Sequence, residues 1–108
     1  MSKISLVTGG SRGLGRNTAV SIAARGGDVI LTYRTGAVEA REVVDQIRAL
    51  GRKGVALPLD VANTASFPAF TSSLREVLRT TWNRVSFDHL INNAGHGEMA
   101  AFADTNEA

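Results

Sequence analysis

The stretch Thr8-Gly9-Gly10-Ser11-Arg12-Gly13-Leu14-Gly15 lies between an apolar run and an alanine-rich amphipathic segment. Residues 4–7 have the pattern of a short buried strand and residues 14–25 that of a helix, so the glycines fall at a strand-to-helix junction. The N–H groups of a first helical turn and the positive end of the helix dipole favour an anion, and glycine lacks the Cβ that would hold it away. We therefore expect phosphate groups to bind backbone amides between Gly9 and Gly15.

The composition is that of a soluble globular protein. The chain has 108 residues, of which 44% are apolar and 20% charged, so we expect one domain spanning residues 1–108. No apolar run approaches the roughly 20 residues that cross a bilayer, which argues against a membrane protein. The sequence has no cysteine and begins without the apolar segment of a signal peptide, which predicts a cytoplasmic setting. The net charge is only +2 and the basic residues are dispersed, so no nucleic-acid partner is expected.

Strand and helix patterns alternate along the chain. Strands are expected at residues 4–8, 29–33, 55–59 and 88–92, and helices at 14–25, at 37–50 and from about 63–66 to 82. Pro58 lacks an N–H group and is tolerated only at the edge of a sheet or the end of a strand. Inward-facing side chains are expected in each helix, namely Leu14, Ala19, Ile22 and Ala23, then Val38, Val43, Val44, Ile47 and Leu50, then Phe67, Phe70, Leu74, Val77 and Leu78.

This alternation predicts an α/β fold with a Rossmann-like parallel sheet. Three successive strand-helix crossovers require parallel strands, and right-handed crossovers place the first two helices on one face and the third on the other. We expect the strand order 3-2-1-4, in which ligands bind above the carboxyl ends of the first and fourth strands. The fourth strand ends at Asn92, and Asn92 and Asn93 can satisfy backbone groups where these two strands diverge.

The spacing Thr8-Gly9-x-x-x-Gly13-x-Gly15, together with Asn92-Asn93-Ala94-Gly95 after the fourth strand, strongly resembles the short-chain dehydrogenase/reductase family. The resemblance covers essentially the whole chain but only the amino-terminal, cofactor-binding half of the family fold. It therefore implies a chain truncated at its carboxyl end, from an oxidoreductase that moves hydride between a nicotinamide and a carbonyl or alcohol substrate.

The resemblance also implies positions for the cofactor. Gly9, Gly13 and Gly15 would line the pyrophosphate. Asp60 and Val61 would border the adenine, where an aspartate at the end of a strand can accept a hydrogen bond from an exocyclic amine. Asn92, Ala94 and Gly95 would lie along the nicotinamide ribose. The full set of candidate cofactor-binding residues is Gly9, Ser11, Arg12, Gly13, Leu14, Gly15, Tyr33, Arg34, Asp60, Val61, Asn92, Ala94 and Gly95.

The residues after the second strand favour NADP over NAD. An NAD site places an acidic residue about 20 positions past the glycines, where this chain has Tyr33 and Arg34. Arg34 can bind a 2′-phosphate with its planar guanidinium group, and Arg12 could approach the same phosphate from the opposite side. Asp28 cannot replace the missing acid, because it lies at the other end of the strand.

No catalytic or metal-binding residue is assigned. The family's reaction depends on a tyrosine followed four residues later by a lysine, whereas the only tyrosine here, Tyr33, is followed by Ala37. The chain alone is therefore not expected to transfer hydride. His89 and His96 have no partner at the spacing of metal ligands.

Several alternatives stay open. Ser11 could bind a phosphate or cap the helix, and Arg12 and Arg34 could be solvated surface residues. The sequence argues against a mononucleotide P-loop, because Arg16 and Asn17 replace its Lys and Ser/Thr. The chain could also be a dinucleotide-binding module without catalysis, or a structural fragment with an empty glycine turn. A bare fourth strand would expose an apolar edge that a second copy could cover, which predicts a homo-oligomer.

Overall fold

The structure, a computed structural model, describes residues 2–93. Strands and helices alternate along this part of the chain as the sequence predicts. The strands are β1 (Ile4–Val7), β2 (Asp28–Tyr33), β3 (Gly54–Pro58) and β4 (His89–Ile91). The helices are α1 (Gly13–Ala24), α2 (Ala37–Ala49) and α3 (Phe67–Val77), with a 3₁₀ turn η1 (Thr64–Ser66) before α3 and a π turn η2 (Leu78–Trp82) after it.

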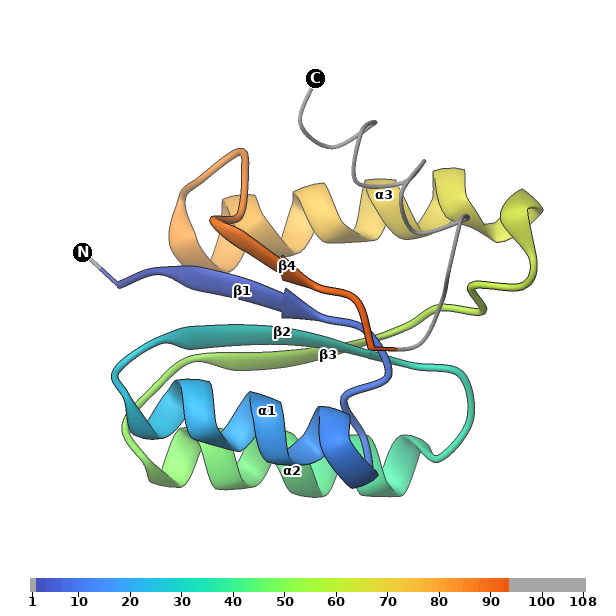
Figure 1. Cartoon of the computed structure of the whole chain (residues 1–108). Coiled ribbons are helices and arrows are strands. Elements are labelled where there is room, and N and C mark those ends of the chain that lie inside the picture. Colours follow the sequence, from blue (N-terminus) through green and yellow to red (C-terminus); the bar gives the residue numbers. More distant parts are fainter. Residues whose placement is uncertain (1, 94–108) are drawn as a thin grey trace.

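The four strands form one parallel sheet in the order β3-β2-β1-β4, which confirms the expected topology. Helices α1 and α2 cover one face, and α3 covers the other (Figure 1). Successive side chains of a strand point to opposite faces, so Leu6 and Ile30 pack beneath α3 while Val7 and Leu31 pack beneath α1 and α2. The two apolar cores fix the sheet between its helices, and with it the places where the strands end.

Three of the side chains expected to point inward do not. Leu14 is 74% exposed, Val38 is 71% exposed and Leu50 is 47% exposed. In α1 the buried positions are Gly15, Ala19 and Ala23, which recur every four residues. Residues four positions apart share one face of a helix, so α1 contacts the sheet through these small residues, and Leu14, which is not on this face, lies at the surface.

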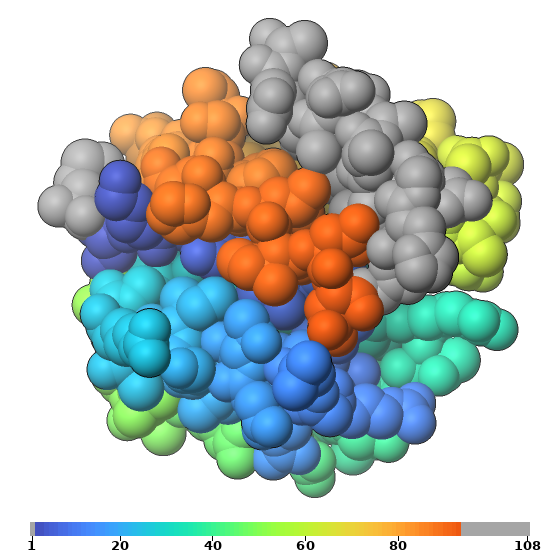
Figure 2. Space-filling model, viewed as in Figure 1, coloured from blue at the N-terminus to red at the C-terminus, as the bar shows by residue number. Residues whose placement is uncertain are grey.

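The two outer strands of the described sheet differ. Strand β3 ends with Pro58, whose missing N–H group costs no ladder bond at this outer position. On strand β4, His89 is exposed and Leu90 and Ile91 are half-buried. Figure 2 shows the segment through β4, in orange-red, at the surface beside the blue α1. Within residues 2–93, no helix has both the length and the apolar character needed to span a membrane.

Candidate functional site

Strands β1 and β4 end side by side and are tied together by the residues that follow them. The Thr8 N–H group donates to the Ile91 carbonyl oxygen at 3.1 Å, and Thr8 Oγ1 accepts a hydrogen bond from the Asn93 N–H group at 2.9 Å. Asn93 Nδ2 in turn donates to the Gly9 carbonyl oxygen at 3.3 Å. The glycine stretch and the asparagine pair, far apart in the sequence, therefore meet where the two strands diverge.

The first turn of α1 packs directly against this junction. A Cβ atom on Gly15 would lie 2.1 Å from the Gly9 carbonyl oxygen and 2.7 Å from Asn93 Nδ2, so no larger residue fits without a shift. Gly13 has open space around it but a φ of +59°, a conformation that side chains disfavour. The two glycines are thus required for different reasons, Gly15 by packing and Gly13 by backbone conformation.

The backbone amides of the glycine stretch fall into two groups. The Gly9 N–H group donates to Thr32 Oγ1 at 3.2 Å and the Gly10 N–H group to the Thr32 carbonyl oxygen at 3.0 Å. The expectation that amides from Gly9 onward are available to an anion is therefore wrong for these two, because strand β2 binds them. The amides of residues 11–15 have no hydrogen-bond partner within residues 2–93. The open donors lie at the amino terminus of α1, where the helix dipole also favours a negative charge.

Ser11 does not cap α1. The residue at the cap position is Arg12, with extended backbone (φ −156°, ψ 169°) and no side-chain hydrogen bond to the first turn. Ser11 itself is buried, with 5% of its surface exposed. Of the two alternatives for Ser11, capping is thus wrong and phosphate binding stays a prediction.

The Arg12 side chain reaches from the glycine stretch to the segment after β2. Its Nη2 atom donates to Thr35 Oγ1 at 3.3 Å, next in the chain to the exposed Arg34. Neither arginine belongs to an ion pair among the described residues. Two arginines that belong to no ion pair of the described residues therefore come from adjoining segments at the carboxyl end of the sheet, and arginine is a residue type that binds phosphate well.

The remaining candidates lie around the same end of the sheet, and some of them have local roles. Tyr33 is half-buried and lines a groove between α2 and β3. Asp60 Oδ1 accepts a hydrogen bond from the Ala62 N–H group at 3.0 Å and so stabilises the turn after β3. Val61 packs against the core beneath α3. Asn92 is exposed beyond β4, whereas Ala94 and Gly95 lie outside the described residues.

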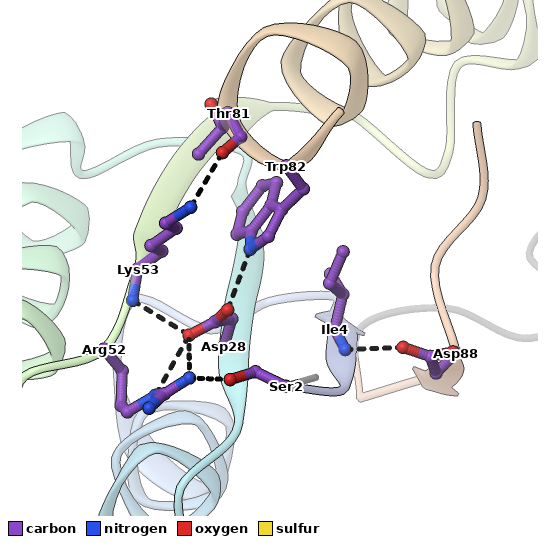
Figure 3. Close-up of polar contacts among 8 residues, drawn as sticks. All are labelled: Ser2, Ile4, Asp28, Arg52, Lys53, Thr81, Trp82 and Asp88. Carbon is purple, nitrogen blue, oxygen red and sulfur yellow. Dashed lines mark hydrogen bonds and ion pairs between the residues drawn. The ribbon is translucent and has the colours of Figure 1, made fainter. Parts of the chain in front are cut away.

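At the opposite end of the sheet, where the strands begin, a polar cluster that the sequence does not predict surrounds Asp28 (Figure 3). The Asp28 side chain is 3% exposed. Its Oδ1 accepts from Arg52 Nε and from the Lys53 N–H group, each at 3.0 Å, and its Oδ2 accepts from Trp82 Nε1 at 2.8 Å. Arg52 also donates to the Ser2 hydroxyl. The cluster joins β2, the α2–β3 turn and η2, and no short sequence motif could have revealed it because its members are far apart.

A second polar group at this end fixes the start of β1. Arg84 donates two hydrogen bonds to the Asp88 carboxylate, at 2.7 and 3.0 Å, and the Ile4 N–H group donates to the same carboxylate at 2.7 Å. The Arg84 hydrogen bonds and then the Ile4 bond hold the pKa of Asp88 well below its usual value. The same pairing raises the pKa of Arg84. Asp88 therefore stays ionised and tied to β1.

Comparisons with known proteins agree with this geometry. A family model described as "short chain dehydrogenase" matches residues 3–108. A hydroxynaphthalene reductase of Aspergillus fumigatus is 36% identical over 95% of this chain and 36% of its own length. A 3-oxoacyl-[acyl-carrier-protein] reductase of Synechocystis is 36% identical over 87% of this chain and 36% of its own.

A solved structure shares the fold. The promiscuous reductase LugOII, which catalyses keto-reduction in lugdunomycin biosynthesis, superposes with a TM-score of 0.80 at 32% identity. The match covers 87% of this chain and 38% of that one. The chain therefore spans between a third and two fifths of the length of these three relatives.

Proposed function

Because the chain belongs to the short-chain dehydrogenase/reductase family, we propose that residues 1–108 form a Rossmann domain that binds NADP at the carboxyl end of its sheet. The domain would serve as the cofactor-binding half of an oxidoreductase. The observation that carries this proposal is the hydrogen bond from Arg12 to Thr35, which brings a cation of the glycine stretch to the end of β2. A 2′-phosphate on the adenosine ribose would sit between this cation and Arg34.

The rest of the cofactor would follow the carboxyl ends of the strands. The pyrophosphate would bind the amides of residues 11–15, Leu14 among them, beside Gly9 and at the positive end of the α1 dipole. The adenine would lie near Tyr33, Asp60 and Val61. The nicotinamide ribose would lie along the residues after β4, which are Asn92, Ala94 and Gly95.

We further propose that the whole protein transfers hydride between the nicotinamide and a carbonyl or alcohol substrate. The names of the two curated relatives, both reductases, support this reaction class. These 108 residues contain no tyrosine followed four positions later by a lysine, so the proton-transferring residues would come from beyond this sequence. A cytoplasmic setting and a homo-oligomer stay predictions, the latter checked by light scattering.

Titration of the 108-residue chain with NADPH and NADH, followed by nicotinamide fluorescence, tests the cofactor assignment. Arg34→Asp places a negative charge beside the proposed 2′-phosphate, so NADPH affinity should fall by about tenfold or more while NADH affinity changes little. Arg75→Asp on α3, across the sheet, makes the same change in net charge and should leave both affinities as they are. Equal affinity for the two cofactors in the original chain and in Arg34→Asp would contradict the assignment to NADP.

A second candidate is a dinucleotide-binding module without catalysis, which the absence of the tyrosine-lysine pair in these residues favours. The intact mass of the protein as expressed separates the two. A mass well above 11.4 kDa supports an oxidoreductase with a further catalytic segment, and an equal mass supports the module. If neither cofactor binds saturably, both candidates fail and the glycine turn is structural only.

A further inference from the structure

A carboxylate lies beside Arg12 at the corner where β2 leads into α2. Gly36 forms this corner with a φ of +81°. A Cβ atom on Gly36 would lie 3.0 Å from Glu39 Oε1 and 3.2 Å from Arg12 Nη2. The two charged groups therefore flank the same point, although they do not form one of the ion pairs of residues 2–93.

This corner is also where the proposed function places the 2′-phosphate. Arg12 is held there by Thr35, the residue between Arg34 and Gly36. Glu39 is half-buried in the first turn of α2, so its side chain lies along the protein surface next to Gly36 instead of extending into solvent. A phosphate bound by Arg12 would thus have the Glu39 carboxylate within several ångströms of the cation that holds it.

We propose that Glu39 is a specificity-determining residue that reduces the preference of this site for NADPH over NADH. The inference rests on the proposed function. The carboxylate repels a 2′-phosphate and offsets part of the charge of Arg12, and both effects weaken NADPH binding. NADH carries a hydroxyl at that position and experiences no such repulsion. The site therefore discriminates between the two cofactors less than its two arginines alone would.

If Glu39 has only a structural role, we expect a different effect on the two cofactor affinities. An acidic residue in the first turn stabilises a helix through the helix dipole, and the cap residue Gly36 supplies no side chain for this purpose. If Glu39 acted only in this way, its loss would loosen the start of α2 and change the affinities for NADPH and NADH by the same factor. The ratio of the two affinities separates the roles, whatever happens to stability.

The experiment measures dissociation constants of NADPH and NADH for the 108-residue chain and for Glu39→Gln, which removes the charge and keeps the shape. NADPH should bind about 3- to 10-fold more tightly to the variant, with NADH changed less than about twofold. The gain should shrink at about 0.5 M salt, where exposed charges more than a few ångströms apart are screened. Asp45→Asn, exposed further along α2, removes the same charge and should leave the ratio unchanged.

Each outcome has a definite meaning. An unchanged ratio, or an equal change for both cofactors, overturns the role of Glu39. If Arg34→Asp still weakens NADPH selectively in that case, the proposed function stands without it. If the original chain binds neither cofactor, the proposed function fails and the inference fails with it.

Discussion

The polar and charged groups at one end of the sheet bind one another, whereas several of those at the other end have no partner among the described residues. Where the strands begin, Asp28 is almost fully buried and accepts hydrogen bonds from Arg52, Lys53 and Trp82. Where the strands end, the amides of residues 11–15 have no partner within the described chain, and Arg12 and Arg34 belong to none of its ion pairs. Polar groups that satisfy one another stabilise a fold, whereas donors left open are available to a ligand. Stabilising polar contacts and the proposed binding site thus lie at different ends of one small sheet.

The direction of the chain explains this division. Each strand of a parallel βαβ unit leads into the amino terminus of a helix, so the unsatisfied N–H groups of α1 and α2 gather at the carboxyl end of the sheet. The opposite end receives the carboxyl termini of the helices, where the chain turns back through Gly26 and Gly51, both with positive φ.

Gly15→Val should have the largest effect, because Gly15 lies in the proposed binding region and also packs tightly against Gly9 and Asn93. The new side chain would collide with the Gly9 carbonyl and with Asn93, so we expect a loss of about 3 kcal/mol in the free energy of unfolding together with loss of NADPH binding. Urea unfolding followed by circular dichroism, and NADPH titration, check this. Gly13→Ala meets no neighbouring atom and should cost only about 1 kcal/mol for its φ. A fully stable Gly15→Val chain that binds NADPH would show that α1 does not pack as described.

Asp28→Ala should separate stability from binding. It leaves Arg52 and the Trp82 indole without their buried acceptor, so we expect a loss of about 2 to 3 kcal/mol in the free energy of unfolding. NADPH affinity should stay within about twofold of the original, because the cofactor would bind at the other end of the sheet. Trp82 is the only tryptophan, so its emission reports the unfolding directly. A several-fold change in NADPH affinity would break the distinction between the two ends.

Acid should weaken the hydrogen bonds that Asp88 accepts at the start of β1. The pKa of Asp88 is lowered in the folded chain, so its contribution to stability is complete above its unfolded pKa near 3.9 and is lost as the pH falls toward the lower folded value. Its side chain is 24% exposed, and we expect a contribution of no more than about 1 kcal/mol. The free energy of unfolding, measured with urea, should decrease less between pH 5 and pH 3 for Asp88→Asn than for the original chain. Asp45→Asn serves as the exposed control, and an equal decrease in all three proteins would contradict the assignment.

The smallest effect should come from Val38→Thr, because the Val38 side chain takes part in none of the polar contacts described at either end. Val38 is 71% exposed, so the free energy of unfolding should change by less than about 0.5 kcal/mol. Ile47→Ala on the same helix removes a fully buried side chain and should cost about 3 kcal/mol. Urea unfolding of the two variants side by side checks whether α2 packs in the orientation described, and a similar loss in both would show that it does not.

The architecture was largely predictable from sequence, because it depends on patterns that repeat along the chain. Apolar runs such as residues 29–33 predicted the strands, and the crossover rules then gave the strand order and the side of the sheet that each helix covers. The meeting of Thr8 with Asn92 and Asn93 followed from the same topology. The prediction for Leu14 was wrong because a hydrophobic pattern weights large residues, whereas α1 contacts the sheet through glycine and alanine. The prediction for Val38 was wrong because the buried face of α2 consists of Ala40, Val43, Val44 and Ile47.

Contacts between distant residues could not be predicted in the same way. The sequence excludes Asp28 as the acidic ribose ligand but does not predict its bond to Trp82, which joins positions 54 residues apart. The hydrogen bonds from the Gly9 and Gly10 amides to Thr32 also join distant positions, so the sequence pattern does not predict them. The candidate cofactor residues were therefore predicted as a region of the sheet, while the contacts of each one emerged only from the structure.

The bond between Thr8 and Asn93 spans 85 positions of the chain. During synthesis, the glycine stretch emerges from the ribosome early but has no Asn93 to hold it until almost the whole described chain has followed. Closing so long a loop is an entropic cost that must be met before the stretch takes its final shape. The earliest part of the proposed site to be made is thus the last to be completed, and in a nascent chain the glycine stretch lacks its Asn93 contacts until strand β4 has docked.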